Sequence, residues 1–144
     1  MKIKLLAAPL LAFLALASAS SPSTAAASDW LKTIENLGWE EVVAEDDSAA
    51  LVRPAHQEGP FVRIWVRYEF RDPIIAGEHR IFSMAALEEY DCEARRSRAI
   101  QRVAYDQNNL RGPSITIDKP GEWSFTLPDT HGAAMTDRVC RDVR

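Results

Sequence analysis

The stretch from Phe61 to Phe70, FVRIWVRYEF, decides the fold. Apolar and polar positions alternate strictly along it, and its side chains are rich in β-branched and aromatic types. This period of two predicts a β-strand with two chemically different faces. One face carries Val62, Ile64, Val66, Tyr68 and Phe70, and the other carries Arg63, Trp65, Arg67, Glu69 and Arg71.

Shorter elements flank this strand on both sides. Trp30, Ile34 and Leu37 recur at helical spacing before Gly38, which predicts a short helix over 28–38. Alternating segments predict further strands, and Gly, Pro and Asp pairs mark the connections. The predicted strands are 39–46, 48–54, 80–90, 114–118 and 122–127, the predicted loops are 55–60 and 71–80, and a C-terminal helix is predicted within 128–143.

The segment from Ala85 to Tyr105 is ambiguous. Leu87, Tyr90 and Ala94 begin a series of residues at helical spacing, and no Gly or Pro interrupts it. Periodicity alone therefore favours a helix slightly over a strand here.

The N-terminus has the pattern of a secretory signal peptide. Lys2 and Lys4 precede an apolar run from Leu5 to Ala17, and small residues follow it. The run is shorter than the roughly 20 residues that a membrane-spanning helix needs. We therefore expect export through the inner membrane, with cleavage after Ala19 or after Ala27.

This interpretation divides the chain into two parts. Residues 1–27 are expected to be the signal peptide and a disordered lead-in, and residues 28–144 are expected to form one domain of about 120 residues. No cysteine lies near the cleavage region, so we expect a periplasmic or secreted protein without a lipid anchor. Without Lys2 and Lys4, 15 basic residues stand against 21 acidic residues, a formal charge of −6. This balance argues against nucleic acid as the main partner.

Cys92 and Cys140 are the two cysteines of the chain. An even number in an exported protein favours a structural disulfide, which would contribute about 4 kcal/mol by closing a long loop. Arginines near Cys92 could lower its pKa, but no histidine close in sequence could act as a base. A redox or catalytic Cys92, and free or intermolecular thiols, remain the alternatives.

The order of these features resembles the surface-adhesin protein E-like family of bacterial envelope proteins. The resemblance rests on WEEV and AEDDSAALVR, IWVRYEF, YDCEARRSRAIQRVAY, GEWSFTLPDT and the late RVC. It extends from about Trp39 to Cys140, with both cysteines in their family positions.

The resemblance implies an α+β fold, in which a small antiparallel β-sheet carries a C-terminal helix that the Cys92–Cys140 disulfide links to one face. It also implies that the segment from Cys92 to Tyr105 is a strand, against the helical periodicity. Members of the family are exported, and the best-known one is an adhesin that binds host extracellular-matrix proteins and can dimerise.

Arginines supply the candidate binding surface. In a strand, Arg96, Arg98 and Arg102 share a face, and the neighbouring strand could place Arg63 and Arg67 beside Trp65. Cationic side chains around an exposed tryptophan suit an acidic polymer or a partner's carboxylates. The alternative is a solvated face paired with the chain's own Glu and Asp residues, or a Trp65 covered by the helix.

The other chemically active residues do not form a recognisable catalytic or metal site. His56, His79 and His131 lie far apart in sequence without a metal-ligand spacing, and Asp46 and Asp47 fit a turn. The sequence also lacks a nucleophile elbow, a P-loop and a dinucleotide-binding motif. We therefore expect no catalytic residues, no metal and no cofactor.

Two classes of function follow from the sequence. The first is a non-enzymatic envelope module that binds an extracellular or envelope protein or an acidic polymer through a sheet face, with a homodimer as a further candidate assembly. The alternative is a small periplasmic enzyme or redox protein that uses Cys92, or a structural envelope accessory protein. The absence of catalytic motifs favours the first.

Overall fold

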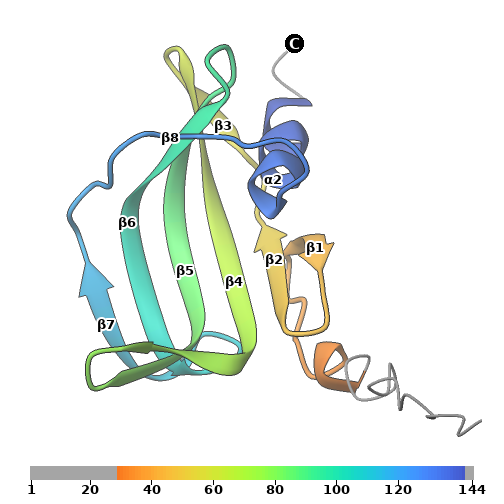
Figure 1. Ribbon diagram of the computed structural model, residues 1–144, viewed down its shortest axis with the longest axis vertical. Coiled ribbons are helices and arrows are strands. Elements are labelled where there is room, and N and C mark those ends of the chain that lie inside the picture. The colour runs from red at the N-terminus through yellow and green to blue at the C-terminus, as the bar shows by residue number, and fades with distance from the viewer. Residues whose placement is uncertain (1–28, 142–144) are drawn as a thin grey trace, which may run out of the picture.

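The computed structural model describes residues 29–141, which form one antiparallel sheet with a helix against it (Figure 1). The main path of the sheet is β1-β2-β4-β5-β6-β7, while β3 pairs with β4 and β8 pairs with β6. The strands are β1 (Glu40–Ala44), β2 (Ser48–Val52), β3 (His56–Glu58), β4 (Phe61–Ala76), β5 (His79–Asp91), β6 (Arg96–Gln107), β7 (Arg111–Ile117) and β8 (Ser124–Phe125), and the helix is α2 (His131–Cys140).

The predicted strand at 61–70 is confirmed, but it continues further than its alternation indicated. β4 extends to Ala76 and pairs with β5 up to Ala76 opposite His79, so the predicted loop at 71–80 is wrong. The register shifts between Glu69 and Ile74, and Pro73 lies in this irregular stretch, where a missing N–H is tolerated. Gly77, with φ of 62°, makes the tight turn between the two strands.

The ambiguous segment from Ala85 to Tyr105 forms two strands and a turn. Helical periodicity is wrong here, and the strand that the resemblance implied is confirmed from Arg96 onward. Cys92 lies in the turn that follows β5, and Arg95 takes a positive φ of 49° in the same turn. β5 and β6 form nine cross-strand pairs, from Ser83–Tyr105 to Asp91–Arg96. The backbone hydrogen bonds of this segment are therefore made between strands and not within a helix.

Two other predicted elements are shorter than expected. The predicted helix at 28–38 is a single helical turn at 29–31, after which the chain folds over the sheet. Its apolar side chains, Trp30, Leu31 and Ile34, pack with Trp39 and other residues on the face of the sheet opposite α2. The predicted strand at 122–127 is reduced to β8, and the predicted loop at 55–60 contains β3.

The main core lies between α2 and one face of the sheet. Met135, Val139 and Cys140 of the helix are buried against Val52, Val62, Ile64, Val66 and Tyr90. The hydroxyl of Thr130 accepts a hydrogen bond from the Ala133 N–H and caps the helix. Cys140 is bonded to Cys92, with 5.6 Å between the two Cα atoms. The structure therefore confirms an antiparallel sheet with a disulfide-linked C-terminal helix.

The opposite face of the sheet holds a buried ion pair. Arg67 and Glu69 are 2% and 0% exposed, and Arg67 Nε lies 2.5 Å from Glu69 Oε1. Asn109 connects the pair to other segments, because its backbone N–H donates to Glu69 and its side-chain oxygen accepts from Arg67 and from the Glu35 N–H. This network joins β4, the β6–β7 turn and the segment before β1.

The expected signal peptide, residues 1–27, lies outside the described residues. Within residues 29–141, no helix combines the length and the apolar character needed to cross a membrane.

The buried ion pair gives the first prediction. Arg67→Met leaves Glu69 as a buried charge without its cation, so the free energy of unfolding should fall by about 3–5 kcal/mol. The matched control is Arg95→Met, which removes a surface pair with Asp137 and should cost at most about 1 kcal/mol. Urea denaturation of both variants measures the difference. Equal losses in the two variants would contradict the burial argument.

The disulfide gives the second prediction. It joins residues 48 positions apart. Loop-closure entropy therefore predicts that the free energy of unfolding of the double variant Cys92→Ala/Cys140→Ala is about 4 kcal/mol lower than that of the oxidised protein. Reductant should lower the urea midpoint of the wild-type chain and leave that of the double variant unchanged. A wild-type midpoint that does not respond to reductant would show that the cross-link contributes nothing to stability.

Candidate functional site

A tryptophan with two arginines against its ring is the centre of the first candidate surface. The Cζ atoms of Arg96 and Arg98 lie 4.8 and 4.5 Å from the ring centroid of Trp123, within the range of a cation–π contact. Phe61 packs beside the same ring, with 5.3 Å between the ring centroids. Phe125 pairs with Arg96 across β8 and β6, and its side chain is 71% exposed.

We call Arg63, Arg96, Arg98, Trp123 and Phe125 the Arg–Trp surface. Its arginines are oriented by carboxylates of β5. Glu89, which is 1% exposed, accepts from Arg63 and Arg98 at nitrogen–oxygen distances of 3.0 and 2.6 Å. Arg96 lies 2.9 Å from Asp91, whose pKa is held below its usual range by the Ala94 N–H and by Arg96. The guanidinium groups are therefore fixed in position, and their half-buried side chains keep donors at the surface.

The structure brings together only part of the predicted site. Arg63, Arg96 and Arg98 lie together on one face as expected. Trp65 and Arg67 belong to the same face, but Trp65 packs in the apolar cluster beneath the segment before β1, and Arg67 is buried with Glu69. The alternative that the arginines pair with the chain's own carboxylates applies to Arg63, Arg67, Arg96 and Arg98.

The expectation that Arg102 shares a face with Arg96 and Arg98 is wrong. The β5–β6 register shifts between Leu87 and Glu88, so that one extra residue of β6 bulges out of the ladder. Arg102 consequently stands opposite Ala86, which in turn pairs with Val66, on the face that α2 covers. A single inserted residue reverses every side chain beyond it.

Sequence reasoning missed Phe61, Trp123 and Phe125 as parts of this surface. Their signal was present, because the alternation in EWSFTL places Trp123 and Phe125 on the same side of an extended segment. The sequence did not reveal that this segment pairs with the first residues of β6, the strand to which Arg96 and Arg98 belong.

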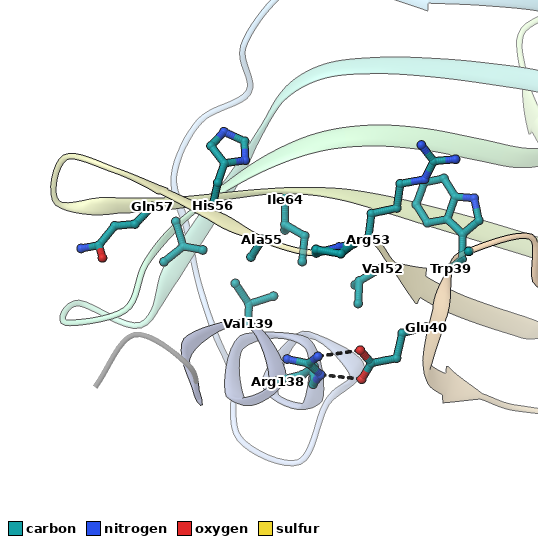
Figure 2. A pocket seen from close by; sticks show the side chains of 13 residues that line it. Trp39, Glu40, Val52, Arg53, Ala55, His56, Gln57, Ile64, Arg138 and Val139 are labelled. Atoms are coloured by element: carbon teal, nitrogen blue, oxygen red, sulfur yellow. Dashed lines mark hydrogen bonds and ion pairs between the residues drawn. The ribbon is translucent and has the colours of Figure 1, made fainter.

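A cleft lies on the other side of the molecule, between α2, β1 and the connection from β2 to β3 (Figure 2). Its volume is about 470 Å³, and its apolar lining is Val52, Val62, Ile64 and Val139. The guanidinium of Arg53 stacks over Trp39 at 4.6 Å. Arg138 of α2 donates two hydrogen bonds to the carboxylate of Glu40 of β1, from Nε and Nη2, each 2.6 Å long. Figure 2 shows the two side chains facing each other.

The Arg138–Glu40 contact joins the helix to the first strand at the rim of this cleft. The hydrogen bonds from Arg138 hold the pKa of Glu40 below its ordinary value. The rim of the cleft therefore carries an ion pair that extends the charged state of Glu40 to lower pH, and Arg53 lines the same cleft. The cleft offers shape and apolar area, but among the lining residues that belong to 29–141 no nucleophile is paired with a base.

The three histidines lie in different places. His56 lines the cleft, His79 begins β5, and His131 pairs with Glu45 at the start of α2. Within the part of the chain that the structure describes, no group of three or more His, Cys, Asp or Glu side chains could hold a metal ion.

Comparison with known proteins identifies solved structures of the same fold and a matching family. A structure of Haemophilus influenzae protein E aligns with a TM-score of 0.56 and 12% identity over 73% of this chain and 85% of that chain. A second structure, of protein E from non-typeable Haemophilus influenzae, aligns with a TM-score of 0.55 and 15% identity over 76% of this chain and 79% of that chain. A search of curated proteins finds no significant match. The family model of the surface-adhesin protein E matches residues 39–141, and the chain therefore belongs to this family of surface adhesins.

Proposed function

We propose that this protein is an exported, non-enzymatic, adhesin-like module that binds a protein partner through the Arg–Trp surface. The observation that carries the proposal is the contact of both Arg96 and Arg98 with the ring of Trp123, with the exposed Phe125 on the adjoining strand. Membership of the surface-adhesin family supports the binding role.

The composition of this surface suits a protein interface. Tryptophan and arginine are enriched among the residues that dominate binding energy, since they combine a large apolar area with directional donors. Leu127, 67% exposed, follows Phe125 after one residue and extends the apolar area. The partner should present carboxylates beside an apolar patch, because the guanidinium groups of Arg96 and Arg98 lie against the ring of Trp123.

The carboxylates behind the arginines limit the attraction of a simple polyanion. Glu89 and Asp91 already offset much of the positive charge, and the whole chain is acidic. Apolar contact must therefore contribute alongside the charges, which favours an extracellular or envelope protein over an acidic polymer. The binding experiment below therefore also includes an acidic polymer.

The disulfide supports a non-enzymatic role. Both cysteines are bonded to each other, so Cys92 offers no thiolate for the redox or nucleophilic chemistry of the alternative hypothesis. The N-terminal sequence pattern supports export into an oxidising compartment, where such a bond persists. We propose a periplasmic or secreted location on these grounds.

The third prediction concerns Phe125→Ala, which removes exposed apolar area and should leave the fold intact. Biolayer interferometry should show saturable binding of the oxidised protein to immobilised extracellular-matrix protein. The variant should bind about tenfold more weakly, which corresponds to a loss of about 1.4 kcal/mol of binding free energy. Trp123→Ala should weaken binding at least as much.

The control is Ile75→Ala, which removes an apolar side chain of similar exposure, 64%, from the distant end of β4. It should bind as the wild-type chain does. Immobilised heparin serves as the acidic-polymer arm, where a response as strong as that to protein would assign the surface to polyanions. Binding that Phe125→Ala leaves unchanged would place the interface elsewhere.

A further inference from the structure

A second carboxylate of β5 points into a cavity that the proposed function does not use. Glu88 lies on the helix-covered face, one residue from Glu89 on the Arg–Trp surface. The cavity has a volume of about 220 Å³ between the first turn of α2 and the sheet, and we call it the Glu88 cavity. This space corresponds to about seven water molecules, at roughly 30 Å³ each.

Glu88 is held as a hydrogen-bond acceptor by two tyrosines. The hydroxyl of Tyr68 donates to Oε1 at 2.7 Å, and the hydroxyl of Tyr90 donates to Oε2 at 2.6 Å. Burial, and then the charge of Glu88, raise the pKa of both tyrosines far above the ordinary value. Both phenols therefore remain protonated donors, and each carboxylate oxygen keeps a lone pair for a further partner.

No protein cation balances this carboxylate. Within residues 29–141, no Lys, Arg or His nitrogen lies within ion-pair distance of Glu88, whereas the neighbouring Glu89 has both Arg63 and Arg98. Arg102 occupies the same face of the sheet, but its Nη2 lies 3.7 Å from the position that a Cβ would take at Gly121, toward the loop before β8. A partly buried carboxylate without a counter-charge favours a cationic ligand.

The remaining walls suit an organic cation. The side chains of Tyr68, Phe70, Tyr90 and Met135 line the cavity and supply aromatic rings and a polarisable thioether. His131 at the mouth is paired with Glu45, so the mouth carries an acidic group as well. The positive end of the α2 dipole lies at His131 and Gly132, and a bound cation would therefore sit deeper, against Glu88. A single carboxylate cannot supply the six to eight oxygen ligands that Ca²⁺ takes.

From this geometry we propose that the Glu88 cavity binds a compact organic ammonium ion of about seven non-hydrogen atoms. Its charged nitrogen lies against the Glu88 carboxylate, and its methyl or methylene groups contact the aromatic wall. The site is independent of the Arg–Trp surface and lies on the other face of the sheet.

The fourth prediction tests this site with choline chloride added to the full oxidised chain. The methyl resonance of Met135 in NMR spectra should shift saturably over choline concentrations up to about 10 mM, as expected for a small ligand of modest affinity. The neutral isostere 3,3-dimethylbutan-1-ol has the same shape without the charge, and it should produce no saturable shift. Vesicles of phosphatidylcholine form a second arm, and a shift with vesicles alone would assign the site to lipid headgroups.

Glu88→Gln keeps the shape of the side chain and should weaken choline binding about tenfold. Glu41→Gln makes the same charge change at an exposed position of β1 and should bind as the wild-type chain does. Phe70→Leu removes one aromatic wall and keeps the carboxylate, so it should weaken binding severalfold even if Glu88→Gln fails to fold. Absence of a saturable choline shift in the wild-type chain, or equal binding of the neutral isostere, would overturn the proposal.

Discussion

The bond between Cys92 and Cys140 sets where α2 can lie. A helix of ten residues is marginal by itself, and its N-cap and apolar face supply only part of what holds it. The disulfide ties the last residue of α2 to the turn after β5, which places Met135 and Val139 over β4 and β5. Residues of this helix form one side of the main core and contribute to the walls of both the cleft beside Arg53 and the Glu88 cavity.

Three glutamates of β4 and β5 have the same chemical group but differ in their surroundings, and they therefore differ in what they do in the structure. Glu69 is buried with Arg67, and Glu89 is buried between Arg63 and Arg98, so both stabilise structure by orienting arginines. Among the described residues, the side-chain hydrogen bonds of Glu88 come from the phenols of Tyr68 and Tyr90, and Glu88 lines the Glu88 cavity. The strand alternation separates Glu88 from Glu89, and the sheet therefore has an arginine-rich face on one side and a carboxylate cavity on the other.

Local chemistry made part of this structure predictable. The alternation at Phe61–Phe70 identified β4, and the even cysteine count favoured the cross-link that the structure contains. Non-local pairing decided the rest. The β6 bulge that turns Arg102 away, the burial of Arg67 and the meeting of Trp123 with Arg96 depend on which strands become neighbours. None of these contacts leaves a periodic signal in the sequence, and they determine most of the candidate site.

Hydrogen exchange of backbone amides tests most directly whether the cross-link holds α2 on the sheet. The oxidised chain should protect the amides of α2 nearly as well as those of β4 and β5. After reduction, protection should fall throughout α2 and persist in the central strands, because the helix then opens without the sheet unfolding. Equal protection of α2 in the oxidised and reduced protein would contradict the account, since packing alone would then hold the helix in place.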